Sequence, residues 1–305
     1  MVTSTKILLV IGIIFTFHTT ITFAKSLRIG AFNIKLFGKA KIGKPDVVEQ
    51  LVQILNRYDL VLIQEIRDKS GTAIVELIQS LNSYSSDEYS MIISSRVGRT
   101  SSKEQYAYFY KSYYFEVTDS YEYDDGDEEL QVDTFEREPF IVRFKCPWTI
   151  VKDFAVVGVH TKPTKAFDEI DSLADVYDDI TNKWGLKDVI IAGDLNAGCT
   201  YVRDWKDNRL KNKRFTWLID DDADTNVSPS QCAYDRFVIA GELLAKSIKP
   251  CSATIFYFSA IYALEYDLTK DVSDHFPIEF QLLEDTKLLE EAETRFLEDL
   301  LDEFP

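Results

Sequence analysis

Two histidines, His160 and His275, follow runs of strand-forming residues in this 305-residue chain. The third histidine, His18, lies in an apolar leader, so these two are the histidines of the remaining chain that can titrate near neutral pH. An imidazole beside a carboxylate suits proton transfer at this pH, because the carboxylate fixes the tautomer and raises the basicity of the ring. One such group that takes a proton from water and one that gives a proton to a leaving oxygen fit hydrolysis of a phosphodiester.

Acid and amide side chains also follow apolar runs, at Asn33, Glu65, Asp194, Asn196 and Asp274. Taken singly, a strand-end aspartate is more often a turn residue or a helix cap. Together these side chains are potential ligands for a cation. Carboxylates such as Glu65 and Asp274 suit Mg²⁺, which binds few protein oxygens and keeps waters for a substrate phosphate. The residues therefore predict metal-dependent phosphoester hydrolysis in a cleft lined by strand ends.

Apolar periodicity predicts the elements that must position these residues. Helices are expected at 45–58, 71–84 and 169–185. Strands are expected at 27–37, 59–66, 89–95, 105–111, 114–123, 140–145, 152–161, 188–198, 233–241 and 275–283. Helices and strands do not alternate strictly, and several strands are close enough for hairpins. This order predicts an α+β fold in which two mixed sheets pack face to face beneath helices.

The first 24 residues have the pattern of a secretory signal peptide, with Lys6 before an apolar run and small residues at Thr22 and Ala24. The run is too short and too weakly flanked to favour a membrane anchor. We therefore expect a secreted protein with no stable membrane association. No linker or repeat divides residues 25–283, which predicts one catalytic domain. An acidic tail follows at 284–305, and its apolar residues have a roughly helical spacing.

Charge argues against nonspecific attraction to nucleic acid, because the formal net charge is -17 and affinity for a polyanion comes mostly from Lys and Arg. The excess is uneven, since the tail holds nine acidic and two basic residues. Acidic runs at 121–129 and 220–224 are usually solvated, but calcium sites are built from the same side chains. Four cysteines in a secreted chain make disulfides plausible and allow three pairings, with free thiols left open for Cys146 and Cys251.

Several motifs resemble the deoxyribonuclease I family in order and approximate spacing, from about residue 27 to 282. They are "AFNIKLFG", "LVLIQEIRD", "VGRTSSKEQYA", "EREPFIV", "VGVHTKP", "AGDLNAGCTYV", "CAYDRFVIAG" and "VSDHFPIEF". "GDLN" and "SDH" are shared with the wider endonuclease/exonuclease/phosphatase superfamily, whereas "KEQYA", "EREP" and "CAYDR" narrow the resemblance to enzymes that act on DNA. Some segments look closer to the deoxyribonuclease gamma branch. The resemblance implies a four-layer α/β/β/α sandwich.

The resemblance also implies roles for the candidate catalytic residues. His160 looks like the general acid paired with Glu104, and His275 looks like the general base paired with Asp235, a carboxylate that orients the ring. Asp194 matches a group that acts both in catalysis and in metal binding. Which histidine is the acid and which the base is the least constrained part of this assignment.

Further residues match binding groups of the family. The expected Mg²⁺ ligands are Glu65, Asp194 and Asp274. Asn33 and Asn196 match groups that stabilise the scissile phosphate, and the expected DNA contacts are Arg67 and Arg137, neither of which would read much sequence. One Ca²⁺ site is expected from Asp125, Asp133, the Phe135 carbonyl and Glu138. A second is expected from Asp224 and the loop 226–230, where a solvated loop is an equal alternative.

Cys199 and Cys232 match the main disulfide of the family, whereas Asp127 and Leu130 stand where its smaller disulfide would be. Ser102 replaces a tyrosine that stacks in the DNA minor groove, which weakens the expected affinity for DNA.

The sequence thus predicts a secreted, monomeric, Mg²⁺- and Ca²⁺-dependent endonuclease that cleaves double-stranded DNA with little sequence specificity and leaves 5′-phosphate ends. The resemblance leaves a nuclear role open. A superfamily phosphoesterase acting on a lipid or small-molecule phosphate would suit the acidic surface better. A non-catalytic relative that binds actin would use the segment around Ile93. The complete set of catalytic residues favours the nuclease over both.

Overall fold

The computed structural model describes residues 26–126 and 134–285. The expected signal peptide, Asp133 and the tail from residue 286 onward lie outside the described residues. The described ends lie side by side, because Ser26 in the first strand pairs with Leu283 in the last.

The first sheet has the strand order β11-β12-β1-β2-β4-β3. Its strands are β1 (Ser26–Phe37), β2 (Leu60–Ile66), β3 (Tyr89–Ile93), β4 (Gln105–Lys111), β11 (Thr254–Ile255) and β12 (Ile278–Leu283). The central strand β1 runs parallel to β2 and antiparallel to β12, so the sheet is mixed.

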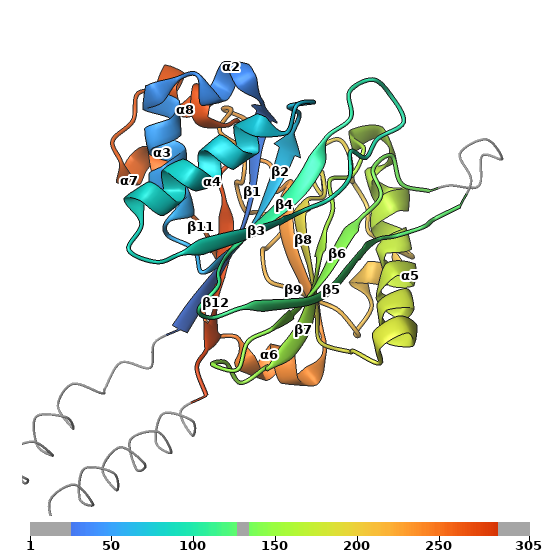
Figure 1. Cartoon of the computed structure of the whole chain (residues 1–305). Coiled ribbons are helices and arrows are strands. Elements are labelled where there is room, and N and C mark those ends of the chain that lie inside the picture. The colour runs from blue at the N-terminus through green and yellow to red at the C-terminus, as the bar shows by residue number, and fades with distance from the viewer. Residues whose placement is uncertain (1–25, 127–133, 286–305) are drawn as a thin grey trace, which may run out of the picture.

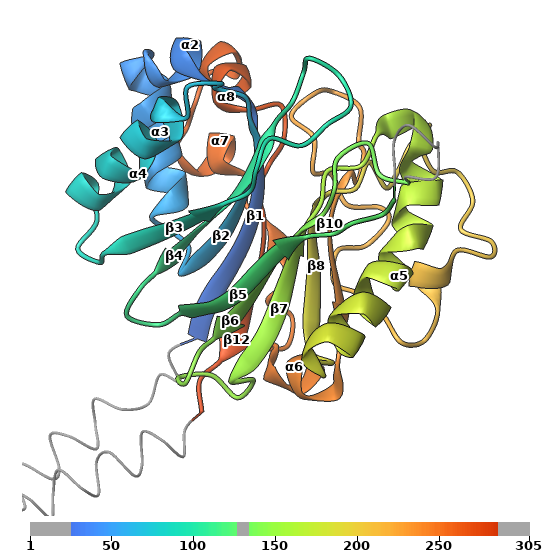
Figure 2. The same ribbon diagram turned by 45° about the vertical axis from the view of Figure 1, so that its right-hand side comes forward.

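The second sheet has the order β5-β6-β7-β8-β10-β9. Its strands are β5 (Glu116–Glu122), β6 (Phe140–Lys145), β7 (Asp153–Gly158), β8 (Val189–Asp194), β9 (Thr216–Trp217) and β10 (Asp235–Ala240). It is also mixed, because β7 and β8 are parallel whereas β8 and β10 are antiparallel. The two sheets pack face to face (Figures 1 and 2).

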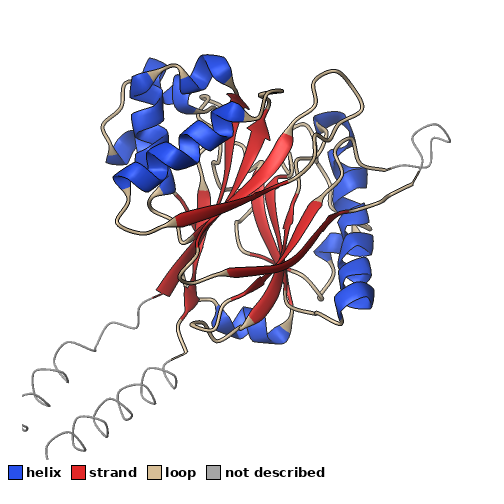
Figure 3. Ribbon diagram, viewed as in Figure 1, coloured by secondary structure: helices blue, strands red, loops and turns tan. Residues whose placement is uncertain are grey.

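Helices cover the outer faces of both sheets (Figure 3). Over the first sheet lie α2 (Lys39–Ile42), α3 (Pro45–Leu55), α4 (Thr72–Tyr84), α7 (Phe258–Ile261) and α8 (Tyr266–Val272). Over the second lies α5 (Ala166–Trp184), which directly follows η2 (Pro163–Lys165). The element η3 (Arg209–Lys211) contacts α5 through ion pairs of Arg209 with Asp171 and Asp175, and α6 (Glu242–Ser247) follows β10. The predicted α+β sandwich of four layers is confirmed.

Three apolar clusters hold the layers together. Between the sheets pack residues such as Leu62, Phe144 and Phe237. A second cluster joins the first sheet to α3 and α4, and a third joins the second sheet to α5. Full burial of an aliphatic or aromatic side chain contributes about 1.5 to 3 kcal/mol. Burial of these clusters is therefore the main free-energy contribution that holds the two sheets and their helices together.

Local sequence explains the long helix α5. Ile170, Leu173, Ala174 and Ile180 are buried at helical spacing against the sheet, and Gly185 ends the helix in the left-handed region with φ 65°. The prediction of this helix is confirmed with its start three residues earlier than expected. The short helices α2, α6, α7 and α8 were not predicted, because segments of four to seven residues are too short to show a periodic apolar face. None of the helices in the described part of the chain has the length and apolarity to cross a membrane.

Candidate active site

The predicted site residues meet around one carboxylate oxygen, Oδ2 of Asp194 at the end of β8. His160 Nε2 lies 3.4 Å from this oxygen, and His275 Nε2 lies 3.5 Å from it. Asn33 Nδ2, from the point in β1 after which its register with β2 shifts, donates to the same oxygen over 3.3 Å. Side chains from both sheets therefore meet at this oxygen, as expected from their positions at the ends of apolar runs, and a cleft at this place stays a prediction.

The His160 arm contains a buried carboxylate partner. His160 Nδ1 lies 2.6 Å from Oε1 of Glu104, which is fully buried just before β4. Burial opposes a charge on the ring, but the Glu104 carboxylate outweighs it and raises the pKa of His160, while Arg137 works against that rise. Since Nδ1 faces Glu104, Nε2 is the nitrogen left for proton exchange with a substrate.

The His275 arm repeats this arrangement. His275 Nδ1 lies 2.8 Å from Oδ2 of Asp235, the first residue of β10. Burial again opposes a charge on the imidazole, yet the Asp235 and Asp194 carboxylates prevail and raise the pKa of His275. Both predicted histidine–carboxylate contacts are thus present in the structure, and both Nε2 atoms face Asp194.

Strained backbone surrounds the β1 and β2 ends. Lys35, Leu36 and Glu65 have φ values of 43°, 49° and 61°, in the left-handed region that side chains rarely adopt. This conformation lets Glu65 Oε1 accept from Asn33 Nδ2 over 3.0 Å, while its Oε2 accepts from the Leu36 N–H over 2.8 Å. Strain of this kind persists where surrounding structure over-determines it, and it is frequent at functional sites.

Gln64 was missed by the sequence analysis, although a polar residue inside the apolar run "LVLIQEI" was a usable signal. Its buried amide joins the sheets, because Nε2 donates to Val159 O over 2.8 Å and Oε1 accepts from Asp194 N over 2.9 Å. The amide also explains Gly193, whose φ is 131°. A Cβ there would lie 2.3 Å from Val159 O and 2.6 Å from Gln64 Nε2, so a larger residue could not hold Asp194 in place.

The oxygen donors near Asp194 suit a hard divalent cation. Glu65 and Asp194 are bridged by Asn33, whereas Asp274 is turned toward Lys35, whose Nζ lies 2.9 Å from its Oδ2. Burial alone would raise the pKa of Asp274, but His275 and Lys35 lower it and keep the carboxylate charged. Among the described residues, the atoms of potential ligands that lie within 4.8 Å of one another belong to Asp194, Asp235 and His275. That group contains the His275–Asp235 pair and Asp194 but neither Glu65 nor Asp274, so the metal role of Glu65, Asp194 and Asp274 stays a prediction.

Comparison of the whole sequence with known proteins identifies the family to which the chain belongs. The sequence matches the Endonuclease/Exonuclease/phosphatase family over residues 30–275. Deoxyribonuclease-1 of Homo sapiens is 48% identical over 262 residues, which cover 85% of this chain and 93% of that protein. Deoxyribonuclease-1 of Rattus norvegicus is 46% identical over 274 residues, which cover 89% and 96%.

This chain belongs to the deoxyribonuclease I family, within the endonuclease/exonuclease/phosphatase superfamily. The family resemblance is confirmed, and the closer similarity to the gamma branch stays a prediction. A solved structure of D. rerio TDP2 complexed with single strand DNA product has a TM-score of 0.60 at 15% identity, covering 84% of this chain and 98% of that chain. A Bacteroides vulgatus member of the superfamily has a TM-score of 0.60 at 16% identity. These two likenesses support the fold.

The two arginines expected to contact DNA in this family both face Glu104. Arg137 Nε lies 3.1 Å from Glu104 Oε1, and Arg67 Nη2 lies 3.4 Å from Glu104 Oε2. The Arg137 side chain is only 12% exposed, against 33% for Arg67. Arg137 is thus partly engaged in holding the His160 pair, and contact of either arginine with DNA stays a prediction.

The first expected Ca²⁺ site of the family is described in part, because Asp133 lies outside the described residues. Asp125 and Glu138 line a cavity of about 350 Å³, and Arg96 and Lys103 line it as well. Asp125 Oδ2 accepts from the Thr134 N–H over 2.7 Å, and the Phe135 carbonyl accepts from Arg99 Nη2 over 3.0 Å. Carboxylates of the expected kind are present, and calcium binding here stays a prediction.

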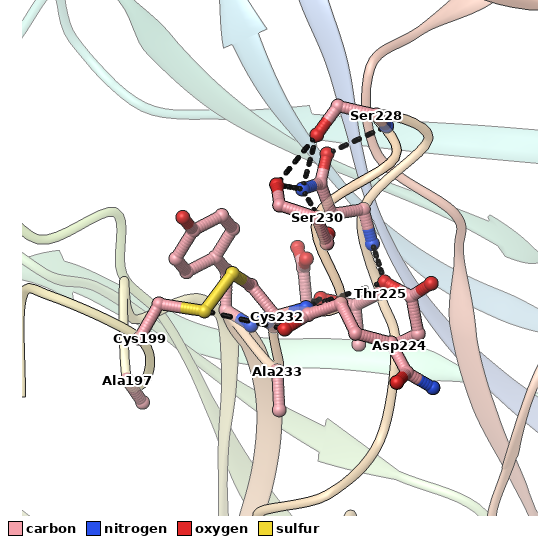
Figure 4. The surroundings of a disulfide bond; sticks show 12 residues. Ala197, Cys199, Asp224, Thr225, Ser228, Ser230, Cys232 and Ala233 are labelled. Atoms are coloured by element: carbon pink, nitrogen blue, oxygen red, sulfur yellow. Dashed lines mark hydrogen bonds between the residues drawn. A yellow bond between two sulfur atoms is a disulfide. The ribbon is translucent and has the colours of Figure 1, made fainter.

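The second expected Ca²⁺ loop lies beside the disulfide (Figure 4). The predicted Cys199–Cys232 bond is present, with the Cα atoms 5.7 Å apart. Asp224 Oδ1 accepts from the Cys232 N–H over 3.3 Å, which ties the loop to the bond. Asn226 Nδ2 donates to Ser228 Oγ and to the Ser230 carbonyl over 2.7 and 2.9 Å, so serine oxygens gather around the Asn226 amide. Calcium binding at this loop also stays a prediction. The other cysteines are free, Cys146 buried and Cys251 exposed.

Proposed function

We propose that this protein is a secreted, divalent-metal-dependent endonuclease that hydrolyses phosphodiester bonds of double-stranded DNA with little sequence specificity. The observation that carries the proposal is the pair of histidines, each held by a buried carboxylate at Nδ1, with both Nε2 atoms within 3.5 Å of Asp194 Oδ2. Relatives that share 44–48% of the sequence and are named Deoxyribonuclease-1 support DNA as the substrate.

In the proposed reaction, one histidine takes a proton from water at its Nε2 as the water oxygen forms a bond to phosphorus. The P–O3′ bond breaks, and the other histidine gives its Nε2 proton to the leaving oxygen, which yields a 5′-phosphate and a 3′-hydroxyl. Glu104 and Asp235 hold the two rings in the tautomer that this transfer needs. The pKa values of both rings are raised, so the assignment of His160 as the acid and His275 as the base rests on the family.

A Mg²⁺ ion would be held by oxygens of Glu65, Asp194 and Asp274. When bound, it would stabilise the negative charge that develops on the phosphate oxygens during the reaction. Asn33 and Asn196 would position the phosphate by hydrogen bonds. The Asn33 amide already donates to both Glu65 and Asp194, and Asn196 Nδ2 donates to Thr161 O over 3.0 Å. Ca²⁺ at the acidic loops would act structurally, by neutralising carboxylates that repel one another.

Secretion is supported by the leader pattern of residues 1–24 and by the disulfide, since such bonds persist in oxidising compartments. We infer a monomer that acts on DNA in solution. Binding of actin has no support in the described residues.

The test is cleavage of supercoiled plasmid by purified protein in Mg²⁺ and Ca²⁺, beside His160→Ala and His275→Ala. We expect nicking and linearisation by the native protein, loss of at least about 10²-fold in rate for each variant, and loss of activity in EDTA that Mg²⁺ restores. Tyr113→Ala is the control, because the Tyr113 side chain is 68% exposed and stacks on Trp148, which is not a residue of the site.

Salt dependence separates duplex DNA from a small phosphate substrate. Binding to a duplex weakens steeply as salt rises, because counterions are released, whereas hydrolysis of bis(p-nitrophenyl) phosphate should change little. A folded protein that leaves plasmid intact across pH 5 to 8 and still hydrolyses the small ester would replace the endonuclease proposal with a small-phosphate esterase.

A further inference from the structure

Glu169 is a buried carboxylate that the catalytic scheme leaves without a role. It lies in the first turn of α5 and is 1% exposed. Its two oxygens accept from two different loops. Oε1 accepts from the N–H of Glu136 over 3.3 Å, and Oε2 accepts from the N–H of Lys162 over 3.1 Å.

Each of these loops carries one residue of the His160 arm. Glu136 directly precedes Arg137, and Lys162 follows His160 by two residues. Arg137 then joins the loops a second time, because its Nε donates to His160 O over 3.0 Å and its Nη2 donates to Thr161 O over 3.2 Å. A side-chain ion pair between Lys162 Nζ and Glu136 Oε2, at 2.7 Å, joins them a third time nearer the surface.

These contacts close a ring that includes the catalytic pair. Arg137 Nε lies 3.1 Å from Glu104 Oε1, and the same oxygen lies 2.6 Å from His160 Nδ1. The Arg137 charge therefore acts on Glu104 and His160 only while its loop is held next to the His160 loop. Glu104 and Glu169 are the groups of this ring that lie on neither loop, and of these two only Glu169 comes from helix α5. It can therefore fix the separation of the two loops from the rigid helix behind them.

We propose that Glu169 is a positioning residue, whose carboxylate holds the Arg137 loop against the His160 loop and so sets the geometry of the Glu104–His160 pair. The proposal deepens the proposed function, on which its activity readout rests. Keeping a carboxylate in this place is costly. Burial raises the pKa of Glu169 to about 7, against the backbone N–H groups of Lys162 and Glu136 and the charge of Arg137, which lower it. A group needed only for packing could be apolar at this position.

The test compares Glu169→Gln with Asp168→Asn. Glutamine has the shape of Glu169 but only one acceptor oxygen, so one of the two backbone N–H groups would face an amide N–H instead. Asp168 is the matched control, because it adjoins Glu169 on the same helix, loses the same charge, and is 66% exposed at its side chain with Lys165 as its partner. We expect Glu169→Gln to lower kcat by about tenfold or more, since misplacement of a catalytic group by 1 Å can cost about 10²-fold, and Asp168→Asn to leave it unchanged.

Proton NMR titration measures the pKa values of the two catalytic histidines separately. A general loss of packing around the site would change both values, whereas the proposal predicts a change in one. Arg137 lowers the pKa of His160, so its release in Glu169→Gln should raise that pKa, while the pKa of His275, on the opposite arm, should stay as in the native protein. If Glu169 acts through Arg137, adding Glu169→Gln to Arg137→Gln should move the pKa of His160 no further. Glu169→Asp, one methylene shorter and unable to span both loops, serves the same test if the glutamine variant does not fold.

A change in the pKa of His160 alone supports the proposal. An unchanged pKa of His160, or equal changes in the pKa values of both histidines in a folded variant, overturns it. The titration needs no substrate, so it remains decisive even if the native protein does not cleave DNA and the proposed function fails.

Discussion

Replacing Glu104 by glutamine tests the electrostatic account of the His160 arm. Burial would raise the pKa of this carboxyl, but the charge and hydrogen bond of His160 and the charges of Arg137 and Arg67 lower it from 4.5 to about 2. Glutamine resembles the protonated form of Glu104 in shape and charge. The substitution therefore removes the stabilisation that the ionised form contributes to the folded state.

The magnitude follows from linkage between ionisation and folding. A carboxyl with a folded pKa of about 2 and an unfolded pKa near 4.5 contributes about 3 kcal/mol at neutral pH. Because the folded value is depressed, this contribution is complete above pH 4.5 and is lost as pH falls toward 2. Glu104→Gln should thus be less stable than the native protein by about 3 kcal/mol at pH 7, equivalent to roughly 6 to 12 °C in Tm, and by much less at pH 3.

Urea unfolding of both proteins at pH 7, 5 and 3 measures this difference. Glu76→Gln is the control, because its side chain is 52% exposed in an ion pair with Lys39 and should change stability by less than about 0.5 kcal/mol. A gap between Glu104→Gln and the native protein that is the same at pH 3 as at pH 7 would refute the electrostatic account. The variant should also lose about 10²-fold or more in cleavage rate, since His160 would lose the carboxylate that orients it.

Two further changes test the other supports of the site. In Asp235→Asn the pKa of His275 should fall, because the Asp235 carboxylate raises it, and an unchanged value by NMR would mean that the Nδ1 contact is not formed in solution. Replacing both Cys199 and Cys232 by serine should lower the free energy of unfolding by about 4 kcal/mol, since the bond spans 33 residues. Cys251→Ser, at an exposed free thiol, should have no measurable effect, and an equal loss in both variants would contradict this reasoning.

Part of the site could be predicted from local sequence. Apolar alternation placed the strands, and polar residues at their ends marked Asn33, Glu65, Asp194 and His275, because a strand's pattern stops where its side chains leave the core. These residue types alone indicated a site for phosphoester hydrolysis. The partners Glu104 and Asp235 came from family motifs, since nothing local links residues 56 or 40 positions away from their histidines.

Other features of the site were beyond local pattern. Gln64 looks like one polar residue in a buried strand, and Glu169 looks like an acidic residue in the first turn of an amphipathic helix. Their roles depend on what packs against them, namely Val159 and Asp194 for Gln64, and two separate loops for Glu169. Neither partner set can be inferred from spacing along the chain.

The sequence by itself determined the classes of element, the family and the set of reactive side chains, because these depend on residue type and short-range periodicity. Only the tertiary structure decided that both imidazoles and Asn33 meet at one oxygen of Asp194. That meeting point follows from the register of two mixed sheets and from the packing of one against the other. Both are set by many apolar contacts acting together, and no single motif encodes them.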